Sequence, residues 1–243
     1  MSNISHCFPH SYLARFVATG YATNDLIWTY ERGLQEIRLC PLKEIQSSYA
    51  EVSDSRATEA TDATIGKLIV GQSLSPSERN EFSQFLSTQW FRVPLSRASV
   101  KADSGGSRIE NPIDESHIST FVEMLIGMRW ALRTTEESEP LVSSDSPVIL
   151  NNPTSIEALG PPTPLAYELL FPLCSHAILI ATWDGHAGQG LLSGHAARQI
   201  NRLISSTAAN FVYASARIPA IARYLSLPRQ ELNRPRFPSK PPA

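Results

Sequence analysis

Cysteine and long apolar runs are both scarce in this sequence. Its 243 residues include three cysteines, Cys7, Cys40 and Cys174, and no CxxC pair. Cysteines this few and this scattered exclude a disulfide framework and a structural zinc site. The most apolar windows, 169–173 and 177–183, are too short to cross a bilayer, so we expect no membrane partner. The first residues, Met-Ser-Asn-Ile-Ser-His, lack the basic and apolar regions of a secretory signal, so we expect a cytoplasmic protein with reduced thiols.

Several motifs that define enzyme classes are also missing. The sequence has no GxGxxG or P-loop pattern for nucleotide phosphates and no GxSxG nucleophile turn. His176, His186 and His195 do not have the i, i+4 spacing of a helical zinc site, and HExxH does not occur. We therefore expect no cofactor, and no metal site built from these histidines.

The composition is that of a globular protein with a substantial core. Of the residues, 42% are hydrophobic and 18% are charged, which excludes a disordered chain. The patterns predict an α+β fold, a single mainly helical domain with a small β-sheet over residues 1–227, and a basic proline-rich tail over 228–243.

One helix start is marked with particular clarity. Ser75-Pro76-Ser77-Glu78 combines an N-cap serine, a proline at the first helical position and a capping-box glutamate. We expect the helix to end near Pro94 or a few residues beyond. The other expected elements are strands at 25–31, 141–150, 167–172 and 177–183, helices at 56–70, 112–133 and 195–216, and loops at 99–108 and 185–194.

Charge is divided unevenly along the chain. From residue 198 onward there are eight basic residues and one acidic residue, 8 − 1 = +7, which leaves 13 − 22 = −9 for the first 197 residues. A basic end on an acidic body indicates an anionic partner such as tRNA or another nucleic acid. The structural alternative is a solvated helix followed by a tail, since the bases are spread over many turns and no aromatic platform is interleaved with them.

The order of several motifs resembles the domain of unknown function 4238 family. The motifs are a His-Pro-Tyr-Leu-Phe pattern from His6 to Phe16, the strand Ile27-Trp-Thr-Tyr30, a helix ending Arg92-Val-Pro94, Ser144-Asp-Ser-Pro-Val148, Phe171-Pro-Leu173, and the stretch 200–213. Ser146 departs from the asparagine of the family pattern. The family is similar in part to fungal enzymes that join amino acids carried on tRNA, including arginine, into cyclodipeptides.

This resemblance implies a polar site on an enzyme that acts on an aminoacylated or RNA-linked substrate. Asp145, Glu59 and His6 are its candidate catalytic residues: the carboxylates would bind an amine or guanidinium, and His6 would transfer a proton. Arg92, Tyr12 and Asn201 are its candidate substrate-binding residues.

Two alternatives stay open beside this transferase or ligase hypothesis. One is a metal-dependent nuclease in which Asp145 and Glu59 hold the ion. The other is a binding or scaffold module without enzymatic activity. In that case Arg92 and Asp145 belong to a buried ion-pair network that stabilises the fold.

Overall fold

The computed structural model describes residues 10–20, 25–34, 36–46, 55–102, 115–151, 168–183, 185 and 187–226, with backbone alone at 10, 46, 55–58, 92–102 and 115–117. Its helices are α1 (His10–Ala14), α2 (Leu42–Gln46), α3 (Ser55–Ile69), α4 (Pro76–Ala102), α5 (Glu115–Gly127), α6 (Gly194–Thr207) and α7 (Pro219–Ser226). Its strands are β1 (Leu26–Glu31), β2 (Ile37–Pro41), β3 (Arg129–Thr134), β4 (Val142–Ser144), β5 (Ile149–Asn151), β6 (Glu168–Cys174), β7 (Ala177–Thr182), β8 (Gly188–Leu191) and β9 (Phe211–Ala214). The tail after residue 227 lies outside the described residues.

The strands form two sheets, so the fold belongs to the α+β class. One sheet has the order β2-β1-β9-β4 and the other the order β5-β6-β7-β3-β8. Most neighbours are antiparallel, whereas β3 and β8 are parallel. β4 and β5 are separated by four residues and belong to different sheets, because Asp145 and Pro147 interrupt the apolar run between them. The sequence pattern predicts one interrupted strand there, and the interruption is where the chain passes from one sheet to the other.

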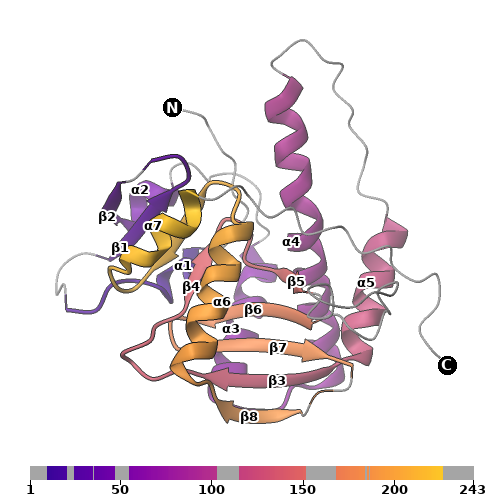
Figure 1. The fold of residues 1–243 in the computed structure, drawn as a ribbon. Helices are drawn as coiled ribbons and strands as arrows, with labels where there is room; N and C mark the ends of the chain where they lie inside the picture. The colour runs from indigo at the N-terminus through magenta and orange to yellow at the C-terminus, as the bar shows by residue number, and fades with distance from the viewer. Residues whose placement is uncertain are drawn as a thin grey trace, which may run out of the picture.

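Two hydrophobic cores lie on opposite faces of the five-stranded sheet. One face carries α6, whose Ile204 is fully buried with Leu170 and Ile178 of the sheet. The other face packs against the N-terminal helices, where Phe82 of α4 and Phe171 of β6 meet edge to face at 6.0 Å. Figure 1 shows α6 in front of this sheet and α3 and α4 behind it. No helix among the described residues has the length and apolar character needed to cross a membrane.

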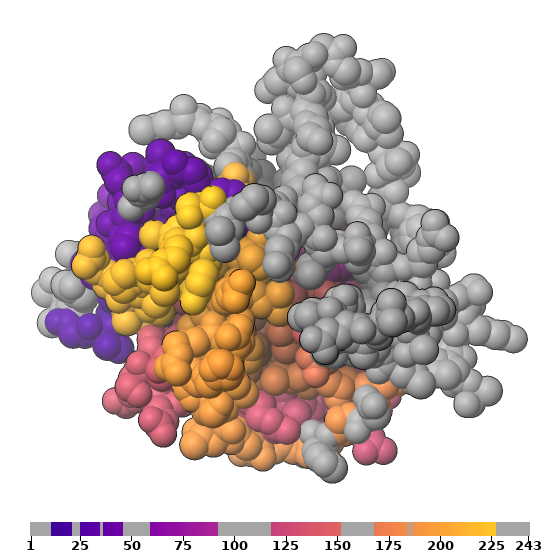
Figure 2. Space-filling view, viewed as in Figure 1, coloured from indigo at the N-terminus to yellow at the C-terminus, as the bar shows by residue number. Residues whose placement is uncertain are grey.

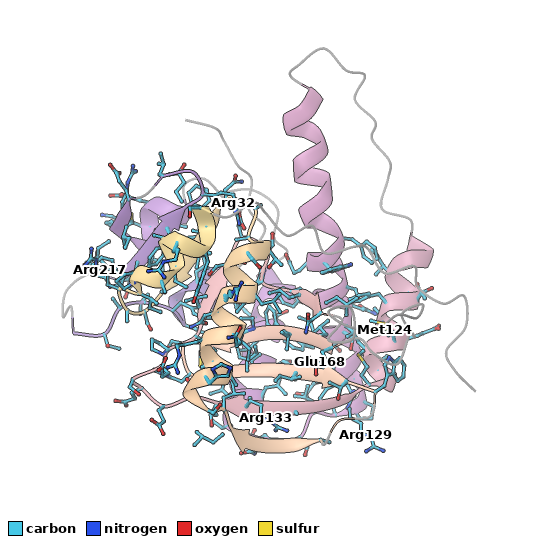
Figure 3. All side chains as sticks on the ribbon, viewed as in Figure 1. Arg32, Met124, Arg129, Arg133, Glu168 and Arg217 are labelled. Carbon is cyan, nitrogen blue, oxygen red and sulfur yellow. The ribbon has the colours of Figure 1, made fainter. Side chains whose placement is uncertain are left out.

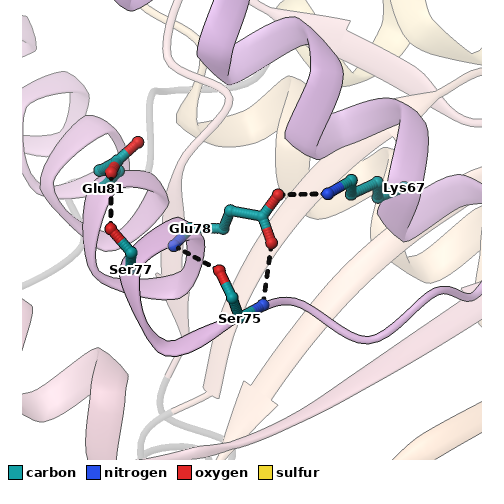
Figure 4. A network of polar contacts seen from close by, with 5 residues as sticks. All are labelled: Lys67, Ser75, Ser77, Glu78 and Glu81. Carbon is teal, nitrogen blue, oxygen red and sulfur yellow. Dashed lines mark hydrogen bonds and ion pairs between the residues drawn. The ribbon is translucent and has the colours of Figure 1, made fainter.

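The predicted capping box at the start of α4 is confirmed (Figure 4). The Glu78 carboxylate accepts a bond of 2.9 Å from the backbone N–H of Ser75, and the Ser75 hydroxyl accepts one of 3.3 Å from the N–H of Glu78. Lys67 of α3 forms an ion pair with the same carboxylate. The hydrogen bond from Lys67, followed by the bonds with Ser75, lowers the pKa of Glu78 to about 2. One side chain thus joins the end of α3 to the start of α4.

Helix α3 ends at a glycine, as its sequence predicts. Gly71 has φ of +72°, a left-handed conformation, and its N–H donates to the carbonyl of Leu68 at 2.9 Å. The N–H of Gln72 donates to the carbonyl of Lys67 at 2.9 Å, which completes a Schellman cap. A Cβ at Gly71 would lie 1.6 Å from the side-chain amide of Gln189, which is exposed and can move, so the backbone conformation is what favours glycine here.

Four predicted boundaries are wrong. Residues 129–133 form β3 instead of the end of a helix, because the segment pairs with β7 from Arg129 to Thr134. Residues 188–191, predicted as loop, form β8 through parallel pairing with β3. The predicted helix 195–216 stops at Thr207, and the β-rich Phe211–Ala214 becomes β9. α4 continues through Pro94 to Ala102, and so includes the first part of the loop predicted at 99–108.

Candidate functional site

Asp145 follows β4 and places its carboxylate at the loop between α6 and β9. Its Oδ1 accepts a bond of 2.7 Å from the backbone N–H of Ala209, and its Oδ2 accepts bonds of 2.6 and 3.1 Å from those of Asn210 and Phe211. Its own N–H donates to the carbonyl of Phe211 at 3.0 Å. The residue is 5% exposed. Three successive N–H groups form an anion-binding loop, and the chain's own carboxylate occupies it.

The cation beside Asp145 is Arg32, which sequence reasoning did not identify. Its guanidinium donates to the carbonyls of Ser205 (2.9 Å) and Ala208 (3.1 Å) at the end of α6, and to that of Leu225 (3.1 Å) in α7. Burial lowers the pKa of Arg32, and the charge of Asp145 acts in the opposite direction. A cation at the C-terminal ends of two helices satisfies carbonyls that the helices leave open.

Tyr12 is buried beneath β4 rather than exposed to solvent. Its hydroxyl lies 2.8 Å from the Ser143 hydroxyl and donates to the carbonyl of Pro172 at 3.0 Å. Its ring stacks on that of Phe171 with centroids 5.3 Å apart. Burial raises the pKa of Tyr12, and the residue is 1% exposed. Tyr12 therefore joins α1 to both sheets.

Asn201 is placed in the same way, by contacts with the backbone. Its Oδ1 accepts a bond of 3.0 Å from the N–H of Val142, and its Nδ2 donates to the carbonyl of Pro140 at 2.9 Å. The residue is 5% exposed on the inner face of α6. Both ends of the amide therefore fix β4 against α6.

Ser146 is buried in the turn that contains Asp145, but its side chain does not take part in the hydrogen bonds of that turn. It is 7% exposed, and its hydroxyl has no hydrogen-bond partner among the described residues. The neighbouring Ser144 hydroxyl accepts a bond of 3.1 Å from the N–H of Ser146. This position, where the chain departs from the family pattern, is the one polar side chain of the turn that the described residues leave unsatisfied.

No described contact brings the other candidates to the polar cluster formed by Tyr12, Asp145 and Asn201. Glu59 is exposed on α3, so its surroundings differ from those of the buried Asp145. Arg92 lies in α4, where only the backbone is described, and His6 lies outside the described residues. Their roles in a site stay predictions from the sequence.

The described part of the cluster consists of side chains bonded to backbone. Tyr12, Asp145 and Asn201 together contact β4, β6 and the segments that flank α6. Within the part of the chain that the structure describes, no three His, Cys, Asp or Glu side chains gather to hold a metal ion. The geometry thus supplies rigid support for β4, α6 and the turn into β9.

A comparison with protein families supports the resemblance noted in the sequence over residues 99–217. A family model described as a protein of unknown function (DUF4238) matches residues 99–217. This part of the chain belongs to the DUF4238 family. The searches of curated proteins and of solved structures found no match. The motifs at 144–148, 171–173 and 200–213 lie within the DUF4238 region, whereas the motifs from His6 to Tyr30 and at 85–94 precede it.

Within the DUF4238 region, the polar residues of the motifs bond to one another's backbone. The Asp145 motif binds the segment after α6, and Asn201 of that helix binds the strand before Asp145. The description of the family names no activity. A function has to be argued from the surface that this framework supports.

Proposed function

We propose that this DUF4238 chain binds a nucleic acid, RNA first of all, through the outer faces of α6 and α7. Tyr12, Asp145 and Asn201 then serve as the internal support of that surface. The observation that carries the proposal is a run of described residues, 198–226, with four exposed arginines and no acidic residue. The four are Arg198, Arg202, Arg217 and Arg223.

Three of these arginines lie on two helices that pack together, and Arg217 lies in the segment between β9 and α7. Arg198 and Arg202 are four residues apart on α6, so they share one exposed face, turned away from the buried Ile204. Arg223 is exposed on α7, whose Ile221 and Leu225 are buried. Figure 2 shows the two helices as one continuous orange and yellow surface, and Figure 3 places Arg217 at its periphery.

Arg32 holds the two helices in a fixed relation, because one guanidinium binds the last carbonyls of α6 and Leu225 of α7. A surface with fixed geometry binds a polyanion at a lower cost in conformational entropy. One of its arginines, Arg198, also forms an ion pair with Glu139 in the loop before β4. A bound phosphate would compete with that carboxylate for Arg198.

The chemistry of this surface fits phosphate better than base recognition. Arginines bind phosphate oxygens through paired N–H groups, whereas sequence readout of single strands needs aromatic platforms. We therefore expect little sequence preference.

We also propose a cytoplasmic location for the protein. The thiols of Cys40 and Cys174 are free, which supports this proposal.

The test is RNA binding by charge-reversal variants, measured by fluorescence anisotropy with a labelled single strand. Arg202→Glu with Arg223→Glu should weaken binding by about tenfold or more, equivalent to 1.4 kcal/mol. Lys43→Glu with Arg129→Glu reverses the same number of exposed charges elsewhere and serves as the matched control. Equal losses in both double variants, or no binding by the wild type at low salt, would reject the proposal.

The same preparation tests the catalytic hypothesis. Incubation with tRNA charged with arginine and analysis for dipeptides should give no product above the control without protein. An arginine-containing cyclodipeptide would overturn the binding-only proposal and favour the transferase. The nuclease alternative draws no support from the described residues and stays a prediction from the sequence.

A further inference from the structure

The five-stranded sheet has an unpaired edge at β8. Among the described residues β8 pairs with β3 alone, and Gly188, Gln189 and Leu191 are exposed. Proteins usually protect such an edge with charged residues, proline or a bulge. The sequence Gly-Gln-Gly-Leu has none of these, so within the part of the chain that the structure describes the edge is protected by its short length of four residues.

The most exposed large hydrophobic side chains of the described residues lie beside this edge. Leu191 is 66% exposed and Val70, which follows α3, is 67% exposed. Side chains at 189 and 191 point to the same face of a strand, and the Gln189 amide donates to the carbonyl of Gly71 at 3.2 Å. Leu191, Gln189 and Val70 are therefore grouped on the α3 side of the edge.

The other side of β8 is covered by the chain itself. A guanidinium nitrogen of Arg133 donates to the carbonyl of Gly188 at 3.0 Å, and it lies 3.4 Å from where a Cβ of Gly190 would be. A partner of β8 therefore meets the backbone edge and the apolar α3 side.

We propose that a second copy of this chain pairs with β8, antiparallel, about a two-fold axis normal to the sheet. With Gly190 of each copy opposite the other, Gln189 faces Leu191 of the second copy on the α3 side. Since Gln189 contacts Gly71, Leu191 of each copy then packs beside Val70 of the other. The contact is self-complementary, as a two-fold interface must be.

The second copy accounts for the observations better than an extended peptide. The pairing covers both exposed apolar side chains with each other and needs no further pocket. It also leaves both α6 helices on one face of the joined sheet, because this axis exchanges the copies without exchanging the faces. α6 begins three residues after β8, so the basic surfaces of two copies would lie along one side and could bind one polymer together.

The experiment is a mass measurement by light scattering on the full chain, without nucleic acid and over a range of protein concentration. The wild type should reach twice the chain mass of 26.8 kDa. Leu191→Lys and Val70→Lys should each return it to the monomer. Leu34→Lys, which changes a hydrophobic residue 43% exposed in the turn between β1 and β2, should leave the dimer intact.

Each other outcome overturns the proposal. A wild type that stays monomeric shows that the edge is unpaired, and a dimer that survives both lysine variants uses another surface. Loss of the dimer in Leu34→Lys would also place the contact elsewhere. All three substituted residues are well exposed, so thermal unfolding should be nearly unchanged, which confirms that a monomeric variant is folded. Because RNA is absent, failure here is separable from failure of the nucleic-acid proposal.

Discussion

Substituting Asp145 by asparagine should destabilise the protein by about 2–3 kcal/mol. The carboxylate accepts three backbone bonds of 2.6–3.1 Å at a position that is 5% exposed. A hydrogen bond to a charged group contributes about 1.5–3 kcal/mol. The asparagine oxygen can keep two of the three bonds at most, and its amide nitrogen then faces an N–H donor. Asp145→Ala, which leaves all three N–H groups unsatisfied, should cost about 3–5 kcal/mol.

Urea unfolding followed by circular dichroism measures this loss in free energy. In thermal unfolding of a chain of this size, the asparagine variant should melt about 4–12 °C below the wild type. Asp25→Asn is the matched control, since Asp25 is exposed and its substitution should change stability by less than about 0.5 kcal/mol. If Asp145→Asn were as stable as the control, the carboxylate would not be holding the loop after α6, and the structural role assigned to it would be wrong.

Ser143→Ala should cost about 1 kcal/mol because it removes one of the hydrogen-bond partners of the buried Tyr12 hydroxyl, whereas Ser146→Ala should be neutral or stabilising because it removes an unsatisfied hydroxyl. Urea unfolding of the two variants side by side tests this, and a larger loss at Ser146 would refute it. The pKa of Glu78, lowered to about 2, makes its contribution to stability complete above about pH 4.5, with loss as the pH falls toward 2. Glu78→Gln should therefore melt below the wild type at pH 6 and approach it near pH 2; a constant difference would contradict the ion pair. Gly71→Ala should lose about 1 kcal/mol or more, because alanine must adopt positive φ against Gln189. A stability equal to that of the wild type would show that the loop relaxes freely.

The parts of the fold that the sequence predicts correctly are those with local signals. The capping box at Ser75 and the terminal glycine of α3 involve residues that are neighbours in the chain, so their pattern is visible there. The strands β3 and β8 depend on each other and on β7, and nothing local distinguishes Arg129–Thr134 from a helix end. Such pairings are set by tertiary contacts, which override a weak local preference.

The candidate site shows the same division. That Asp145 needs partners follows from its place in an otherwise apolar strand, where a carboxylate must be satisfied, and the structure buries it and gives it three backbone donors. Its partners could not be predicted, since Ala209 and Asn210 offer only their backbone and are 64 and 65 residues away. Arg32 has no local signal either, because its bonds reach carbonyls 173 to 193 residues along the chain.

The salt dependence of RNA binding tests the central claim most directly. If Arg217 and the three exposed arginines of α6 and α7 all contact phosphates, the logarithm of the association constant should fall against the logarithm of salt concentration with a slope of about −2.8 for a single strand. Substituting Arg202 and Arg223 should make that slope shallower by about 1.4. A slope near zero, or one that the double variant leaves unchanged, would contradict nucleic-acid binding by this surface.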